Sequence, residues 1–260
     1  MKRLIAVWIV AILVGCNSNP ATDPTGQQPV AQQGAGNDAT QRAKVHTKLG
    51  MAYASEGRLS VALDEARLAI ALDSTYPLAY NLMGFVQMLL RDVRQAEEYF
   101  GQALRLAPGD PEINNNYGWF LCQTDHQQQS FAHFEAAARN PLYSTPTKPL
   151  TNAGICAIYI KDDNAAEAYF QRALKVDPAN ADARSLLAGV CYRLGRYGEA
   201  RLNLNELHKL AEPSAESVWL GIRIERKLGG REEEARYASL LRRKFRDSEE
   251  YKKYVQGLDE

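Results

Sequence analysis

Four cysteines and four histidines are the side chains of this 260-residue chain whose chemistry must be explained first. The cysteines are Cys16, Cys122, Cys156 and Cys191, and none belongs to a C-x-x-C motif. The histidines are His46, His126, His133 and His208, and none has a cysteine or carboxylate at metal-ligand spacing. G-x-S-x-G, P-loop and H-E-x-x-H motifs do not occur. We therefore expect no catalytic residue, metal or cofactor and a protein that is not an enzyme, so the cysteines are left for lipid or disulfide chemistry.

Cys16 ends a segment with the composition of a bacterial export signal. Lys2-Arg3 supply positive charge, and Leu4–Val14 is an apolar run too short to span a bilayer but typical of a signal peptide. Leu13-Val14-Gly15-Cys16 resembles the lipobox, in which a peptidase cuts before a cysteine that carries a thioether-linked diacylglyceryl group. The sequence thus predicts a signal peptide over residues 1–15 and lipidation at Cys16. The alternative is an ordinary secretory peptide that happens to contain a cysteine.

The residue after the cysteine bears on location. By resemblance to bacterial lipoproteins, Asn17 in place of aspartate implies export to the outer membrane, with the protein anchored on the periplasmic face. Residues 17–40 are rich in Gln, Asn, Ala, Gly and Pro and have no periodic apolar face. We therefore predict a disordered tether over residues 16–40, ahead of a folded domain over 41–260. A chain of this length has a typical span of about 27 Å and a stretched limit near 80 Å.

The folded domain contains a repeat of about 34 residues. The first helix of each unit has a small residue at Gly50, Gly84, Gly118, Gly154, Ala188 and Gly221. The second helix has one at Ala62, Ala96, Ser130, Ala166 and Ala200, followed four residues later by Ala66, Phe100, Phe134, Phe170 and Leu204. Small residues at this spacing let two antiparallel helices touch closely, and one such pair needs stacked neighbours to bury its apolar face.

This pattern resembles the tetratricopeptide repeat. It predicts an all-α fold, a right-handed superhelix of about six helix pairs plus a C-terminal helix, whereas the alternative is an irregular helical bundle. We place the repeats near 43–76, 77–110, 111–144, 147–180, 181–213 and 214–246. The three prolines of Asn140–Pro149 forbid regular helix, so we expect the second helix of repeat three to end early. Phe245–Tyr254 is expected to form a helix that covers the exposed end.

In this repeat family the concave face is lined by first-helix residues. Carried onto this sequence, that rule selects Asn81, Phe85, Met88, Asn115, Trp119, Tyr159 and Tyr192. We expect Phe85, Met88 and Trp119 to be anchors for a protein partner, since aromatic residues and methionine often are, although they could instead pack between repeats. Asn81 and Asn115 lie 34 residues apart and could bond with a partner's extended backbone or simply be solvated.

The charge balance limits the classes of partner. Lys plus Arg and Asp plus Glu both number 31, so no global field favours nucleic acid. We expect no small-molecule substrate either.

Cys122, Cys156 and Cys191 lie midway along the first helices of three successive repeats. Facing helices stacked about 8–10 Å apart can bring their Cα atoms within disulfide range. An oxidising compartment such as the periplasm favours a disulfide over free thiols. The spacing alone allows either Cys122–Cys156 or Cys156–Cys191.

Several strings go beyond the generic repeat. The string Asn114–Cys122, the Pro-rich Asn140–Pro149 segment and the string Asn152–Cys156 resemble the type IV pilus biogenesis lipoproteins of the PilF/PilW family, called pilotins. Leu220–Ile224 and Phe245–Glu249 also match in kind, so that with the lipobox the resemblance covers nearly the whole chain.

The resemblance implies a Cys122–Cys156 bridge, with Cys191 left buried and reduced. It also implies an outer-membrane lipoprotein whose repeat surface binds the pilus secretin and promotes its localisation and multimerisation. The repeats and lipobox alone suit an alternative equally well. That alternative is a scaffold lipoprotein of another envelope machine, for outer-membrane protein assembly or peptidoglycan synthase activation.

Overall fold

The computed structural model describes residues 29–32 and 37–258, which form a short 3-10 helix (η1, Val30–Gln32) and thirteen α-helices. Cys16 and the predicted signal peptide lie outside the described residues. The helices are α1 Asp38–Ser55, α2 Leu59–Leu72, α3 Pro77–Leu89, α4 Val93–Leu106, α5 Pro111–Gln123, α6 Gln127–Ala138, α7 Thr147–Tyr159, α8 Asp163–Val176, α9 Ala181–Arg193, α10 Tyr197–Leu210, α11 Ala215–Leu228, α12 Arg231–Lys244 and α13 Glu249–Gln256. In these ranges no helix has the length and apolar composition needed to cross a membrane.

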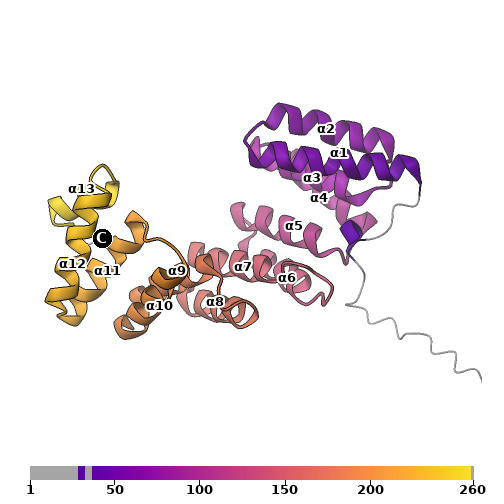
Figure 1. Cartoon of the computed structure of the whole chain (residues 1–260). Helices are drawn as coiled ribbons and strands as arrows, with labels where there is room; N and C mark the ends of the chain where they lie inside the picture. Colours follow the sequence, from indigo (N-terminus) through magenta and orange to yellow (C-terminus); the bar gives the residue numbers. More distant parts are fainter. Residues whose placement is uncertain (1–28, 33–36, 259–260) are drawn as a thin grey trace, which may run out of the picture.

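The first twelve helices form six pairs that stack into a curved array (Figure 1). Each odd-numbered helix packs on the even-numbered helix that follows it and on the one that precedes it. The odd-numbered helices α1 to α11, here called the first helices, also contact one another in sequence and form one continuous wall. The predicted all-α tetratricopeptide fold is confirmed.

The small residues of the first helices accept a large side chain from the paired helix. A Cβ atom at Gly84 would lie 2.9 Å from Cγ of Phe100, and one at Gly118 would lie 2.9 Å from Cε1 of Phe134. Both phenylalanine rings are buried. The spacing of glycine and phenylalanine is therefore the reason these helix pairs close tightly.

In repeats one, two, four and five the chain turns between the two helices through a left-handed residue. Gly57 and Gly195 take this position in repeats one and five, each with φ of 75°. The equivalent residues of repeats two and four are Arg91 with φ of 64° and Lys161 with φ of 62°. Only glycine adopts this conformation without steric penalty, so the two longer side chains are held there by the surrounding helices.

The N-terminal boundary differs from the prediction. Helix α1 begins at Asp38, where the side chain of Asn37 accepts a 2.7 Å hydrogen bond from the Thr40 amide. Residues 29–32 are also ordered, because Pro29 is buried and Val30 packs on the helices. The prediction of a disordered tether over residues 16–40 is wrong for these residues, since an apolar side chain and a capping amide give them local contacts.

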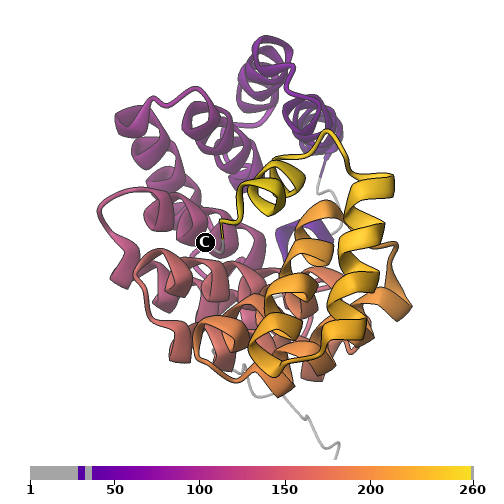
Figure 2. The same cartoon turned by 90° about the vertical axis from the view of Figure 1, so that its left-hand side faces the viewer.

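The proline-rich segment is shorter than predicted. Helix α6 ends at Ala138, as expected for an early stop, and α7 already begins at Thr147. Pro149 therefore lies in the first turn of α7, where its missing N–H breaks no helical hydrogen bond. At the other end, α13 packs on α11 and α12 and covers the end of the stack (Figure 2).

Candidate protein-binding groove

A row of asparagines crosses the wall of first helices. Asn116 Nδ2 on α5 donates to Asn81 Oδ1 on α3 at 3.3 Å, and Asn115 Nδ2 donates to Asn116 Oδ1 at 3.1 Å. Asn152 Nδ2 on α7 then donates to Asn115 Oδ1 at 2.9 Å. We call these four residues the asparagine ladder. It joins the first helices of repeats two, three and four through polar contacts.

The ladder corrects one expectation from the sequence. Asn81 and Asn115 are each only 1% exposed. They are neither solvated nor free to bond with the backbone of a partner, because their amides are used between the repeats. Burying a side-chain amide without a hydrogen-bond partner would lower the stability of the fold. The ladder therefore fixes the position of each of these first helices relative to the next.

Beside the ladder the wall is hollowed into two adjoining pockets. The smaller, of about 280 Å³, is lined by Met51, Phe85, Glu112, Asn115, Asn116, Trp119, Lys148 and Asn152. The larger, of about 590 Å³, shares Lys148 and Asn152 with it. Its other residues are Thr145, Thr147, Thr151, Ile155, Asn180, Asp182, Ser185 and Leu186. Together they form a groove along repeats one to five, called here the inner groove.

The predicted anchors lie in or near this groove in partly buried positions. Phe85 and Trp119 line the smaller pocket, and both are half-buried. Met88 packs with Phe85 on the cluster that contains Phe120, away from the pocket lining. The sequence left open whether Phe85 and Trp119 bind a partner or pack between repeats. In the structure, one face of each ring packs between repeats and another faces the groove.

The two predicted tyrosines differ in accessibility. Tyr159 is 56% exposed, and its ring centroid lies 6.4 Å from that of Trp119. Tyr192 is half-buried between the Arg223 guanidinium, 4.4 Å from its ring centroid, and Tyr197. Tyr159 is therefore an aromatic surface that a partner can reach directly, whereas Tyr192 is already stacked within the protein.

A disulfide lies directly behind Trp119. The structure bonds Cys122 of α5 to Cys156 of α7, with their Cα atoms 5.7 Å apart. Both sulfurs are buried in the cluster on which Trp119 packs. Cys191 is buried and is not in a disulfide. The pair is the one implied by the family resemblance, and it locks together the two helices that hold the centre of the groove.

The loop between repeats three and four is fastened to the groove rim by Glu112. Its carboxylate accepts a 2.6 Å hydrogen bond from the Tyr143 hydroxyl and a 2.8 Å bond from Lys148 Nζ. Burial raises the pKa of Tyr143 far above its usual range, and the nearby Glu112 charge acts in the same direction. The phenol therefore stays protonated and can donate this hydrogen bond throughout the physiological range.

Several groove residues were missed by sequence reasoning, among them Met51, Lys148 and Asn152. Met51 lies exactly one 34-residue repeat before Phe85, so the repeat register could have found it. Lys148 lies within the Pro-rich Asn140–Pro149 segment and Asn152 directly follows it. This segment shifts the repeat register and hides their equivalence to groove positions of other repeats.

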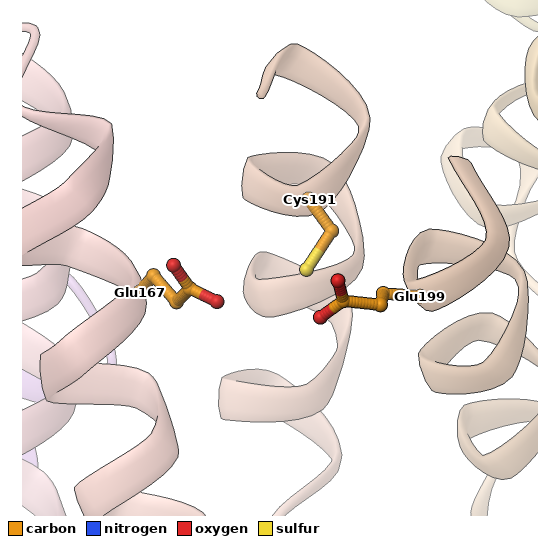
Figure 3. A group of neighbouring side chains, drawn as sticks. All are labelled: Glu167, Cys191 and Glu199. Carbon is orange, nitrogen blue, oxygen red and sulfur yellow. The ribbon is translucent and has the colours of Figure 1, made fainter. Parts of the chain in front are cut away.

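One further cluster of potential ligand atoms lies outside the groove. Glu167, Cys191 and Glu199 bring a carboxylate oxygen, a sulfur and another carboxylate oxygen within 4.8 Å of one another (Figure 3). Arg196 forms ion pairs with both glutamates. Burial, together with the Glu167 charge, raises the pKa of the Cys191 thiol to about 11. A protonated thiol is a poor metal ligand, and the guanidinium already supplies positive charge to both carboxylates.

Comparison with known proteins places this architecture among tetratricopeptide repeat proteins. The tetratricopeptide repeat family matches residues 88–144 and 163–215. The crystal structure of PilW, described as a widely conserved type IV pilus biogenesis factor, is 31% identical and has a TM-score of 0.74. The match covers 82% of this chain and 98% of PilW.

A second relative is the type IV pilus assembly protein PilF of Pseudomonas aeruginosa. It is 24% identical over 253 residues, which are 97% of each chain. The solved structure of P. aeruginosa PilF has a TM-score of 0.74 at 22% identity and matches 85% of this chain and 100% of its own. The likeness thus extends over the full stack of helix pairs.

Proposed function

This chain belongs to the PilF/PilW family of tetratricopeptide repeat proteins, and we propose that it is a type IV pilus lipoprotein that binds the pilus secretin. In this proposal it acts at the outer membrane, where it promotes secretin localisation and multimerisation. The observation that carries the proposal is the extent of the likeness to PilW, which spans nearly all of that pilus biogenesis factor.

The inner groove supports a role in gripping a polypeptide. Phe85 and Trp119 line it, and the exposed Tyr159 lies outside its lining but beside Trp119, so aromatic faces are available in and next to the groove. Aromatic side chains are common anchors at protein interfaces. Lys148 and Asn152 add polar groups along the same wall. A groove of this composition suits a segment that offers apolar side chains and backbone hydrogen bonds.

The mechanism is physical rather than chemical. The acyl chains on Cys16 supply membrane affinity, and the N-terminal segment links them to the repeat domain. The groove captures a secretin subunit, which is thereby held near the membrane. Linking these two interactions replaces a search through the periplasmic volume by a search on a surface, without any new contact with the secretin.

The direct test is binding of the purified secretin to the mature protein. We expect the Tyr159→Ala and Phe85→Ala variants to bind roughly tenfold more weakly, which is the loss of about 1.4 kcal/mol expected for one aromatic anchor. Leu202→Ala is the matched control, because Leu202 is 66% exposed on α10, outside the groove. Thermal unfolding of each variant separates loss of binding from loss of fold.

Identifying the bound partner also distinguishes the proposed role from the alternative one, a scaffold lipoprotein of another envelope machine. Recovery of outer-membrane assembly factors or peptidoglycan synthases in place of the secretin, from detergent-solubilised envelopes, would overturn the proposal. In cells, Cys16→Ser should leave a folded protein while the secretin fails to reach the outer-membrane fraction. Normal secretin localisation in that strain would contradict the anchoring role.

A further inference from the structure

Residues 29–32 fasten the N-terminal segment to the middle of the stack and not to its end. The Val30 amide donates to Asp110 Oδ2 at 2.7 Å, across 80 residues of sequence. The Val30 side chain packs on an apolar cluster that includes Tyr76, Leu78 and Ile113, and Pro29 is buried. We call residues 29–32 the strap.

The strap is held by a residue that also starts a helix. Asp110 is 2% exposed and is the N-cap of α5, where its Oδ1 accepts a 3.0 Å hydrogen bond from the Ile113 amide. Its other carboxylate oxygen is used by Val30. A buried carboxylate needs such partners, so the site is built to hold a backbone amide at this place.

Because the strap is bound to the repeat domain, it shortens the segment that joins Cys16, the proposed lipid anchor, to the repeats. Only residues 17–28 separate Cys16 from Pro29, which is half the length expected for the whole tether. A link of twelve residues can span at most about 40 Å. A lipid on Cys16 would therefore lie within about 40 Å of the strap, which is bonded where α4 ends and α5 begins (Figure 1).

The protein edge at this point has the composition of a membrane-facing surface. The turns from α4 to α5 and from α6 to α7 lie on the same edge, because second helices end and first helices begin there (Figure 1). Leu106 is 38% exposed and Leu142 is 46% exposed. Arg105 and Arg139 are exposed beside them. Exposed leucines with neighbouring arginines suit the headgroup region of a bilayer that contains anionic lipid.

We propose that the strap turns this edge, formed by the turns from α4 to α5 and from α6 to α7, toward the lipid surface. The inference rests on the proposed lipidation of Cys16 but not on secretin binding. In this orientation α5 and α7 point away from the membrane. The wall of first helices, with its inner groove, then faces sideways along the membrane, where a neighbouring protein can reach it.

The test places a fluorophore on either edge of the lipidated protein in vesicles of phosphatidylethanolamine and phosphatidylglycerol that carry a headgroup quencher. Ser144→Cys labels the strap edge, and Asn164→Cys, at the start of α8, labels the opposite edge as the matched control. The native Cys191 is buried, and Cys122 is bonded to Cys156, so labelling is directed to the new thiol. We expect at least twofold stronger quenching at residue 144 than at residue 164.

Two further measurements make the result decisive. Val30→Asp should release the strap, lengthen the free link and equalise quenching at the two positions, while circular dichroism stays that of the parent. Equal quenching in the parent, or a difference that survives Val30→Asp, would overturn the inference. Flotation of the vesicles reports lipidation separately. Absence of flotation overturns the anchor and this inference together, whereas flotation with equal quenching overturns the inference alone.

Discussion

The side-chain amide of Asn152 on α7 donates a 2.9 Å hydrogen bond to Asn115 Oδ1 on α5. Asn115 in turn donates to Asn116, so the two bonds make Asn115 the centre of the ladder. The polar groups of the groove floor thus belong to the fold as well as to the binding surface. This arrangement explains why a groove between helices can be lined by buried amides.

Removing the centre of the ladder should destabilise the protein. Asn115→Ala leaves the amides of Asn116 and Asn152 without their partner, which costs about 1–3 kcal/mol of unfolding free energy. Urea denaturation of the variant against the parent measures this loss. Asn164→Ala is the control, since Asn164 is exposed, and it should change stability by less than about 0.5 kcal/mol. An Asn115→Ala variant as stable as the control would show that the ladder contributes nothing.

The disulfide should contribute more than the ladder. It closes a loop of 34 residues, for which the chain-entropy relation gives about 4 kcal/mol at 25 °C. We expect a reducing agent to lower the unfolding free energy of the parent by about 2–5 kcal/mol. The Cys122→Ala/Cys156→Ala double variant should then be insensitive to reductant. Sensitivity to reductant in the double variant would mean that another thiol, not this bond, is responsible.

The repeat register could be predicted from the sequence, because it depends on contacts between residues of one helix pair. Gly84 and Phe100, for example, contact each other within one repeat, so size and spacing suffice to predict them. Asn81 and Asn115 were misjudged because their partners belong to neighbouring repeats. The strap was hidden for the same reason, since Val30 is ordered by Asp110, 80 residues away.

The left-handed turns allow a stabilising substitution. Arg91 and Lys161 have φ of 64° and 62° and are exposed, so glycine would relieve backbone strain without removing a buried contact. We expect Arg91→Gly and Lys161→Gly each to raise the unfolding free energy by up to about 1 kcal/mol, after the entropy of a glycine in the unfolded chain is deducted.

The reverse substitution is the control for these turns. Gly195 has φ of 75°, and a Cβ atom there would meet no atom within 4 Å. Any loss in Gly195→Ala therefore measures backbone strain less the entropy that alanine removes from the unfolded chain, and we expect a loss of up to about 1 kcal/mol. If Arg91→Gly and Gly195→Ala changed stability in the same direction, strain at this position would not be the cause.

Stability should fall in mild acid because of His133. Burial lowers its pKa below that of an ordinary histidine, and its Nδ1 lies 2.9 Å from Asn114 Oδ1. Well above pH 6.5, the ring is neutral in both the folded and the unfolded chain, so the full stability is present. As the pH falls through about 6.5, the unfolded chain binds a proton before the folded chain does, and stability is lost until the lower folded pKa is passed. Urea denaturation between pH 7.5 and 5 measures this slope.

His208, whose pKa burial also lowers, contributes in the same direction. His133→Phe should flatten the slope and His133→Phe/His208→Phe should flatten it further, whereas His126→Phe, at an exposed position, should leave it unchanged. A slope that is the same in all four proteins would assign the acid sensitivity to the carboxylates instead.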